Sequence, residues 1–244
     1  MAFSFDLFWS FRSPYCYLTL DRILGLSRDH GVDVVVRPVY PMAVRQPDFF
    51  NKTNPLYRPY HTLDSHRVAE SLGVPFRRPL PDPIRMDMET SEIDPEQPTI
   101  FRLTRLGMAA AMGDLGLEFL DQVSRIIWDG PVDGWDQPPH LAEAMTRAGL
   151  DGEKLERDIA ADPDTFDAAI HENEDAHAQA GHWGVPCMVF DGEPFYGQDR
   201  LDLLMWRVRG KGLESTFIFL SITRAGLKSW AISYLVTSKN LKYC

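Results

Sequence analysis

Hydrophobic residues form short runs near the two ends of the chain and recur with a helical period between them. Residues 3–9 alternate and are rich in aromatic side chains, and residues 32–36 are largely β-branched, so both segments predict buried strands. Between them, residues 15–30 carry apolar side chains at helical spacing, and Gly31 follows as a stop signal. This β-α-β order predicts two parallel strands.

The middle of the chain is predominantly helical in pattern. Segments 38–59 and 76–98 are rich in proline and polar turn residues and predict long irregular loops. The predicted helices between and after these loops cover residues 60–72, 99–112, 117–128, 139–148, 151–161 and 165–180.

Strand character returns at residues 187–190. Asp191-Gly192 then predicts a tight hairpin turn into a strand at 194–196, and a last helix is expected over 200–208. The whole order is β-α-β, a helical block and β-β-α. It predicts an α/β fold in which an all-helical insertion interrupts a small sheet.

The same pattern divides the chain into two expected domains and a tail. The expected boundaries are 1–60 with 181–212 for a discontinuous sheet domain, 61–180 for the helical insertion domain and 213–244 for a C-terminal tail. The tail is apolar and basic, with Glu214 as its one acidic residue. This composition is typical of a C-terminal helix or an appended segment, and the alternative is an amphipathic helix that meets a membrane or a partner.

Charge and cysteine content exclude several classes of protein. The net charge of −10 disfavours nucleic acid and anionic membranes as partners, because phosphate binding needs clustered Lys and Arg. No stretch is long enough to predict a membrane span, and the N-terminus has no basic region typical of a signal peptide. Cys16, Cys187 and Cys244 are too widely spaced to indicate a disulfide framework or a metal site, so a reducing cytoplasm is expected.

Three further features have ordinary structural explanations. Trp9 is expected in the core, although an aromatic substrate could also use it. Asp64 and Arg67 stand three residues apart and predict a surface ion pair. His171 and His177 are six residues apart and share no helix face, so we expect a solvated acidic helix there and no metal site.

The first candidate motif is Ser13-Pro14-Tyr15-Cys16, at the predicted turn from strand to helix. The N-terminus of a helix stabilises an anion, which in thiol redox proteins is a cysteine thiolate. Ser13 occupies that position here and can donate a hydrogen bond to a thiolate from another molecule. The alternative is a plain helix start, with Ser13 as the N-cap and Cys16 as a small buried hydrophobe.

Two other motifs lie far along the chain. Val185-Pro186 enters a predicted strand, and a cis bond there would expose the Val185 backbone to a peptide-like ligand. Gln198-Asp199 precedes the last helix, where Asp199 either caps the helix or, with Gln198, binds the amino-acid end of a ligand. All three motifs are expected to meet at one edge of the sheet.

Together these stretches resemble the group of 2-hydroxychromene-2-carboxylate isomerases and kappa-class glutathione transferases, within the DsbA-like thioredoxin-fold family. The similarity covers residues 3–210 and includes Gly184-Val185-Pro186 and Gly197-Gln198-Asp199-Arg200-Leu201. It implies a thioredoxin-like sheet, glutathione as cofactor and Ser13 as the catalytic residue that hydrogen-bonds the glutathione sulfur. The chain departs from the group's usual pattern at Arg12 and at Cys16, where many relatives have serine.

The resemblance also implies the rest of the glutathione site. The Val185 backbone would pair with the cysteinyl part, Gln198 and Asp199 would hold the γ-glutamyl end, and Asn51 or Asn54 would supply a further amide. The expected site comprises Ser13, Pro14, Tyr15, Val185, Pro186, Gln198, Asp199, Asn51 and Asn54. Arg58 would replace a basic residue of the group in the same loop.

The function implied is a glutathione-dependent isomerase or transferase that acts on a small, apolar, aromatic electrophile. Two alternatives stay open: a thiol oxidoreductase that uses Cys16, and a non-catalytic protein that binds glutathione or another ligand. An accessible Cys16 with a low pKa would favour the first alternative. Relatives suggest a homodimer, and the sequence identifies neither the electrophile nor the oligomeric state.

Overall fold

The chain folds around a mixed four-stranded sheet with the strand order β2-β1-β3-β4. The computed structural model describes residues 3–87 and 89–212. The strands are β1 (Ser4–Trp9), β2 (Asp33–Pro38), β3 (Cys187–Phe190) and β4 (Glu193–Tyr196). The helices are α1 (Pro14–His30), α2 (Met42–Arg45), α3 (Phe49–Lys52), α4 (Tyr57–Leu72), α5 (Pro98–Met112), α6 (Gly116–Trp128), α7 (His140–Arg147), α8 (Gly152–Ala161), α9 (Pro163–Gln179) and α10 (Leu201–Gly210).

Strand β1 is central, and its neighbours come from opposite ends of the chain. It pairs in parallel with β2, as the β-α-β pattern predicts, and antiparallel with β3, where Phe8 lies opposite Cys187. Trp9 is fully buried, which confirms its expected place in the core. Helices cover both faces of the sheet, so most β1 side chains on either face are buried, and this explains the aromatic run at the N-terminus.

The second half of the sheet is the predicted hairpin. Asp191 and Gly192 connect β3 to β4 with φ angles of 53° and 78°. Positive φ at both central residues is the backbone that a two-residue hairpin needs, and an Asp-Gly pair adopts it readily. Pro194 is tolerated in β4 because this strand lies at the edge of the sheet and has one neighbour.

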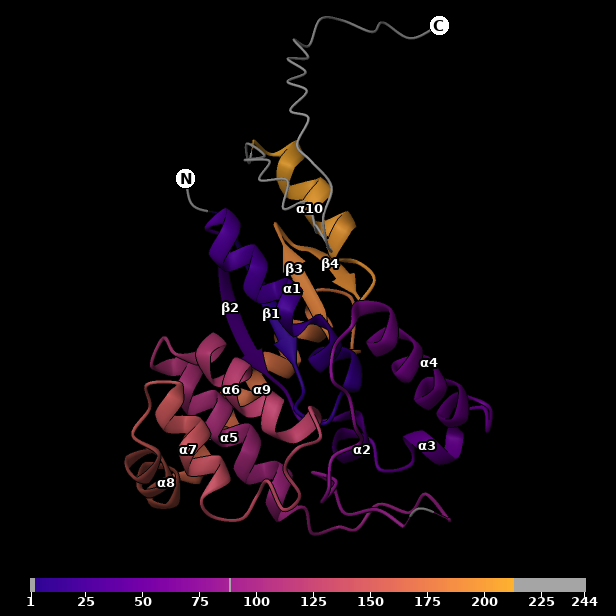
Figure 1. Cartoon of the computed structure of the whole chain (residues 1–244), viewed down its shortest axis with the longest axis vertical. Helices are drawn as coiled ribbons and strands as arrows, with labels where there is room; N and C mark the ends of the chain where they lie inside the picture. The colour runs from indigo at the N-terminus through magenta and orange to yellow at the C-terminus, as the bar shows by residue number, and fades with distance from the viewer. Residues whose placement is uncertain (1–2, 88, 213–244) are drawn as a thin grey trace, which may run out of the picture.

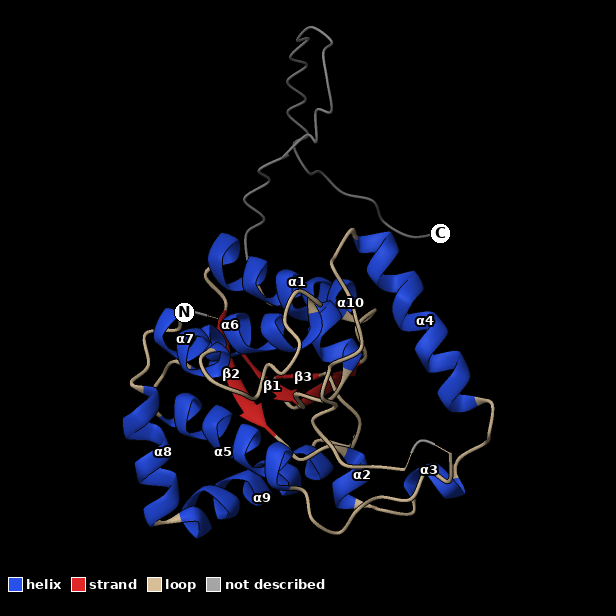
Figure 2. Ribbon diagram, turned by 60° about the horizontal axis from the view of Figure 1, so that its bottom comes forward, coloured by secondary structure: helices blue, strands red, loops and turns tan. Residues whose placement is uncertain are grey.

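The helical block lies beside the β2 edge. Figure 1 shows α5 to α9 gathered on that side of the molecule, with α4 on the opposite side and α10 beside the hairpin. In Figure 2, α1 and α10 lie above the sheet and α9 below it. The predicted fold class, a small α/β sheet interrupted by helices, is therefore confirmed, whereas the predicted domain boundaries stay a prediction.

The loop predicted at 38–59 is more ordered than its sequence pattern suggests. It contains two one-turn helices, α2 and α3, and α4 starts at Tyr57, three residues before the predicted start. Pro59 therefore lies within the first turn of α4. The N–H groups of a first turn have no partner inside the helix, so a proline there costs little.

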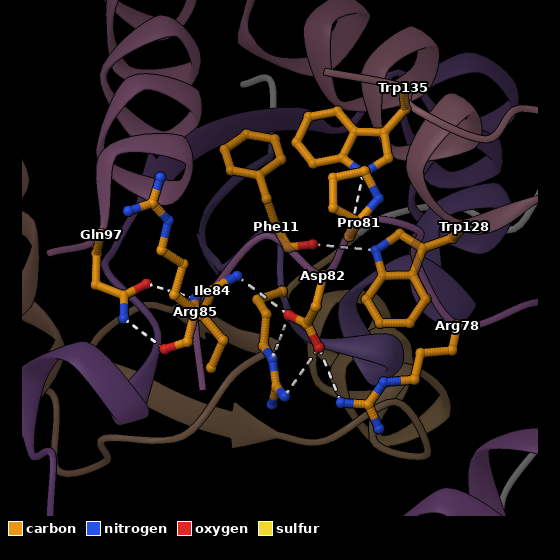
Figure 3. A network of polar contacts seen from close by, with 10 residues as sticks. Phe11, Arg78, Pro81, Asp82, Ile84, Arg85, Gln97, Trp128 and Trp135 are labelled. Atoms are coloured by element: carbon orange, nitrogen blue, oxygen red, sulfur yellow. Dashed lines mark hydrogen bonds and ion pairs between the residues drawn. The ribbon is translucent and has the colours of Figure 1, made fainter. Parts of the chain in front are cut away.

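Segment 76–98 is irregular, as predicted, and is fixed by specific hydrogen bonds. Trp135 Nε1 donates to the Pro81 carbonyl at 2.8 Å, and the Arg77 N–H donates to the Trp128 carbonyl at 2.8 Å. Gln97 both donates to and accepts from the Arg85 backbone, at 2.7 and 2.9 Å. Figure 3 shows the contacts made by Trp135 and Gln97.

Helix α9 is the predicted solvated acidic helix on one face only, where His171, Glu172 and Asp175 are exposed. His177 is fully buried, and its ring stacks on Phe8 with centroids 4.3 Å apart. Glu174 faces inward and accepts the Tyr40 N–H at 3.0 Å, while His171 Nδ1 lies 3.0 Å from Glu174 Oε2. The sequence pattern missed this inward face because α9 packs polar residues against the sheet, where backbone donors need acceptors.

No helix within residues 3–87 and 89–212 has both the length and the apolar character to cross a bilayer. The tail predicted at 213–244 lies outside the described residues.

A close approach between α5 and the β1–α1 turn generates a stability prediction. A Cβ at Gly107 would lie 2.6 Å from Cζ of Phe11, a buried ring that packs edge-on against Phe119 at 5.6 Å. We expect Gly107→Ala to lower the free energy of unfolding by about 1–3 kcal/mol, because the ring has no space to withdraw. Urea denaturation measures this change.

Gly25→Ala in α1 is the matched control. Its Cβ would lie 3.7 Å from the nearest atom, an ordinary contact, so it should raise stability by up to about 1 kcal/mol through helix propensity. Equal gains from both substitutions would contradict the packing account.

Candidate active site

Ser13 lies where the chain leaves β1 and begins α1. Its N–H donates to the Ser10 carbonyl at 3.0 Å, which closes the turn, and Pro14 follows as the first helical residue. Ser13 Oγ accepts the Cys16 N–H at 3.3 Å, so Ser13 is the N-cap of α1. The cap leaves the hydroxyl proton available at the positive end of a 17-residue helix.

The second motif meets the first across the sheet. The Val185-Pro186 peptide bond is cis, as predicted, and Ser13 Oγ donates to the Val185 carbonyl at 3.5 Å. The Gly197 N–H donates to the Pro186 carbonyl at 2.9 Å and holds this turn against the end of β4. The Ser13 contacts are long for hydroxyl hydrogen bonds, so the proton can be redirected to a stronger acceptor.

One cavity joins these residues. Ser13, Pro14, Tyr15 and Val185 all line it, whereas Pro186 is buried behind the surface. Its other walls come from α2, α3, α4, the 76–98 segment, the end of α6, the turn before Pro186 and the end of β4. Aromatic side chains are prominent among them: Phe49, Phe50, Phe76, Trp128, Trp183 and Tyr196. A cavity of this kind accommodates a flat apolar ligand beside a polar group.

Tyr15 connects the start of α1 to α4. Its hydroxyl donates to Asp64 Oδ2 at 2.6 Å, and its ring centroid lies 4.5 Å from that of His61. Burial and the Asp64 carboxylate raise the pKa of Tyr15 above its ordinary value. Burial and the positive charge of Arg12 lower the pKa of His61 to about 4, so this imidazole is neutral near neutral pH.

Asp64 therefore does not belong to the surface ion pair predicted with Arg67. The sequence pattern suggested that pair because the two residues are neighbours on a helix face. It contained no sign of Tyr15, which is 49 residues away and reaches Asp64 through the tertiary fold. His61 was missed for the same reason.

Both described cysteines, Cys16 and Cys187, are buried. Burial raises the pKa of Cys16 to about 12, against the lowering effect of donors at Ser10 and Ser13, and it raises the pKa of Cys187 to about 12 as well. Cys16 is 0% exposed, which agrees with its interpretation as a small buried hydrophobe. A redox role requires an accessible thiol with a low pKa, and Cys16 has neither property in this structure.

The third motif lies away from the cavity. The Gln198 side-chain oxygen accepts from Arg22 of α1 at 2.9 Å, and Asp199 Oδ2 lies 2.5 Å from Arg200 Nη1. Neither Gln198 nor Asp199 lines the cavity that holds Ser13. Asp199 does not cap α10 either, because the N-cap position is Arg200 and makes no side-chain capping bond.

Asn51 and Asn54 line a second cavity instead. This cavity borders the first, and the two share Phe50, Tyr57, Arg58, Thr62 and Arg78 as wall residues. Asn54 Oδ1 accepts the Leu56 N–H at 2.9 Å, so it is partly used in starting α4. The structure thus brings Ser13, Tyr15 and Val185 together and leaves the asparagines and Gln198-Asp199 at separate places.

Comparisons with known proteins agree with this architecture. A family model described as "DSBA-like thioredoxin domain" matches residues 5–208. The chain is similar in structure to a 2-hydroxychromene-2-carboxylate isomerase, with a TM-score of 0.60 and 20% identity over 87% of this chain and 100% of that chain. A search of curated protein sequences finds no match.

Two further solved structures are similar. A probable DsbA oxidoreductase from Streptomyces coelicolor has a TM-score of 0.59 and 20% identity, over 92% of this chain and 96% of that chain. The cytosolic disulfide reductase DsbM from Pseudomonas aeruginosa, in a structure with GSH, has a TM-score of 0.53 and 16% identity, over 84% of this chain and 99% of that chain. At these identities the similarity shows a shared fold.

The buried cysteines generate a prediction about thiol reactivity. With a pKa of about 12, a thiolate fraction of roughly 10⁻⁴ is expected at pH 8, so Cys16 and Cys187 should resist alkylation in the native protein. Peptide mapping by mass spectrometry after iodoacetamide treatment at pH 8 measures this. Both sites should react once the chain is unfolded in guanidinium, and rapid native labelling of Cys16 would contradict the burial described here.

Proposed function

We propose that this chain, which belongs to the family of DSBA-like thioredoxin domains, is a glutathione-dependent isomerase or transferase. The observation that carries the proposal is the position of the Ser13 hydroxyl, at the N-terminus of α1 and 3.5 Å from the Val185 carbonyl. A member of a thiol family with a serine at this position can activate a thiol that it does not itself contain.

The residues around Ser13 fit the sulfur end of glutathione. The hydroxyl donates only one long, weak hydrogen bond, to the Val185 carbonyl, while its oxygen accepts the Cys16 N–H. The N-terminus of α1 adds positive potential at the same point. The cis Val185-Pro186 turn brings backbone polar groups to the cavity wall, where a peptide can pair with them. When bound, glutathione supplies a thiolate nucleophile, which these groups stabilise relative to the thiol.

The cavity wall supports an aromatic electrophile. Phe76 and Trp128 stack with centroids 5.6 Å apart and planes within 9°, and both line the cavity. Such parallel rings offer a flat apolar surface to a planar substrate. Tyr15 adds a phenol to this wall, and its raised pKa keeps the hydroxyl protonated. If the Tyr15 hydroxyl releases Asp64, it can donate to an oxyanion that develops on the substrate.

The other glutathione contacts that we propose require side chains to leave their present partners or involve the second cavity. For Gln198 and Asp199 to hold the γ-glutamyl end, Gln198 would have to release Arg22 and Asp199 would have to turn from Arg200. Asn51 and Asn54 border the second cavity and would meet the ligand there. A homodimer in the cytoplasm stays a prediction from the resemblance.

The redox alternative has less support than the serine-centred function. It would depend on Cys16, which is fully buried with its pKa raised to about 12 by that burial. The structural neighbour solved with GSH is a disulfide reductase, and that activity belongs to that protein. A non-catalytic binding protein would bind glutathione without turnover, and the experiment below separates this outcome from catalysis.

We expect Ser13→Ala to shift the pH dependence of glutathione conjugation to higher pH. The lost hydroxyl donor stabilises the thiolate, so its removal raises the pKa of the bound thiol by about 0.5–1 unit and lowers the rate at pH 7 up to about tenfold. The rate is measured from pH 6 to 9 with an aromatic electrophile such as 1-chloro-2,4-dinitrobenzene. An unchanged pH profile would contradict the assigned role of Ser13.

Asp151→Ala is the control for the lost helix cap. Asp151 accepts the Lys154 N–H at 3.0 Å as the N-cap of α8, outside the residues that line the cavity. Each substitution should cost about 1 kcal/mol of stability, but only Ser13→Ala should move the pH profile. Glutathione binding by calorimetry without turnover on any aromatic electrophile would leave a binding protein as the function.

A further inference from the structure

The turn that carries the Val185 carbonyl is held by a histidine that the proposed function does not use. His182 Nδ1 accepts the Gly184 N–H at 2.9 Å. The next residue, Val185, has its carbonyl oxygen 3.5 Å from Ser13 Oγ. An imidazole nitrogen accepts a hydrogen bond only while it carries no proton, so this contact requires the neutral ring, with its proton on Nε2. The protonation state of His182 is therefore tied to the backbone beside Ser13.

Ring packing fixes the His182 side chain against this turn. The imidazole stacks on Tyr196 of β4, with centroids 4.0 Å apart and planes inclined by 20°. The Trp183 ring stacks on it as well, with centroids 5.7 Å apart and planes inclined by 15°. A Cβ added at Gly184 would lie 2.5 Å from Tyr196 Cε2 and 3.1 Å from His182 Cε1. The Gly184 backbone thus lies directly against both rings, so a movement of the imidazole has to move the turn.

Two other hydrogen bonds fix the same turn, and neither depends on pH near neutrality. Arg45 Nη2, from α2, donates to the Trp183 carbonyl at 3.0 Å. The Gly197 N–H donates to the Pro186 carbonyl at 2.9 Å. A guanidinium and a backbone amide keep their protons in this range, whereas a histidine ordinarily titrates within it. Of these three contacts, the one made by His182 is the contact that a proton can break.

The surroundings of His182 favour its neutral form. The titratable and charged side chains around this histidine and its turn are His177 and Glu174 of α9, Arg45 of α2 and Tyr196 of β4. Glu174, the carboxylate in this set, accepts the Tyr40 N–H at 3.0 Å and lies 3.8 Å from Arg45 Nε. It is therefore already engaged by other groups, and a protonated His182 finds no free counter-ion in the set.

Burial acts in the same direction on both histidines. The ring centroids of His177 and His182 lie 6.4 Å apart, and His177 is fully buried. Burial, and then the positive charge of Arg45, lower the pKa of His177 to about 4, so this neighbour is neutral near neutral pH. Burial also lowers the pKa of His182 below its ordinary value. The hydrogen bond to Gly184 is thus intact at neutral pH and is lost in acid.

We propose that His182 is a positioning residue: its neutral Nδ1 holds the Gly184-Val185 backbone in place for a peptide ligand beside Ser13, and proton uptake by His182 releases this backbone. The affinity of the cavity for such a ligand then falls as the pH drops below about 6.5, the ordinary pKa of histidine. The inference rests on the proposed function for its ligand, glutathione. The coupling of His182 to the turn rests on contacts within the chain.

Isothermal titration calorimetry of the full chain with S-methylglutathione, from pH 5.0 to 7.5, tests the effect on the ligand. This ligand keeps the peptide groups of glutathione but has no ionisable thiol. Its affinity therefore reports pairing with the turn and is independent of the activation of sulfur by Ser13. Its carboxylates and its amine hold their charges over this range, so a fall in affinity reports the protein. Loss of the hydrogen bond predicts about five- to tenfold weaker binding in acid.

Two substitutions separate the hydrogen bond from the ring. His182→Asn places an amide oxygen, which does not titrate, at the position of Nδ1, so it should keep the affinity at pH 7.5 within about twofold and remove the fall in acid. His182→Phe keeps a ring against Tyr196 but has no acceptor, so it should bind about five- to tenfold more weakly at pH 7.5. His140→Asn on α7, outside the cavity lining, is the matched control and should keep the original pH profile.

Amide hydrogen exchange measured by NMR tests the turn without any ligand. At pH 7.5 the Gly184 N–H should be protected in the unsubstituted protein and in His182→Asn, and unprotected in His182→Phe. At pH 5.0 the unsubstituted protein should lose this protection, measured against the intrinsic exchange rate at that pH, and His182→Asn should retain it. Thermal unfolding followed by circular dichroism verifies that each variant is folded.

The outcomes separate this inference from the proposed function. Binding by His182→Phe that is as tight as in the unsubstituted chain, or an acid fall that persists in His182→Asn, overturns the role of His182. An affinity that stays constant down to pH 5.0 overturns the release by a proton. If neither glutathione nor S-methylglutathione binds at any pH, the proposed function is overturned, and the Gly184 N–H decides the inference alone. Protection that depends on His182 supports it, and protection unchanged by both substitutions overturns it.

Discussion

The antiparallel pairing of β1 with β3 is the constraint on which the site depends. It places Phe8 opposite Cys187, so the end of β1 and the start of β3 lie side by side. Ser13 and Val185, 172 positions apart, then come within hydrogen-bonding distance. The Val185-Pro186 bond beside that contact is cis. The cavity exists because two distant segments end at the same place.

Much of the remaining wall depends on contacts that fix an irregular segment. Residues 76–98 have little regular secondary structure, yet Trp128 and Trp135 anchor their path through backbone contacts. Trp128 also donates to the Phe11 carbonyl at 3.0 Å, which ties the helical block to the turn just before Ser13. This anchoring brings Asp82 to Arg12, so the charge of the cavity is decided by loop packing.

The same geometry bears on the proposed serine-centred chemistry of this thiol-family scaffold. The N-terminus of α1 offers its positive potential at Ser13, one turn before Cys16 reaches the interior. Desolvation keeps the Cys16 sulfur protonated, whereas the Ser13 hydroxyl faces the cavity and needs no ionisation to donate. A helix start can thus stabilise a thiolate brought by a ligand while its own cysteine takes no part.

Local pattern in the sequence determined the β-α-β start, the Asp191-Gly192 hairpin and the turn at Ser13, because each depends on neighbours within a few residues. Tertiary structure decided three other features: the short helices α2 and α3, the inward face of α9, and the contact of Tyr15 with Asp64. It also decided the separation of Gln198 from the cavity by its bond to Arg22. Burial and long-range partners set these features, and neither has a periodic signal in the chain.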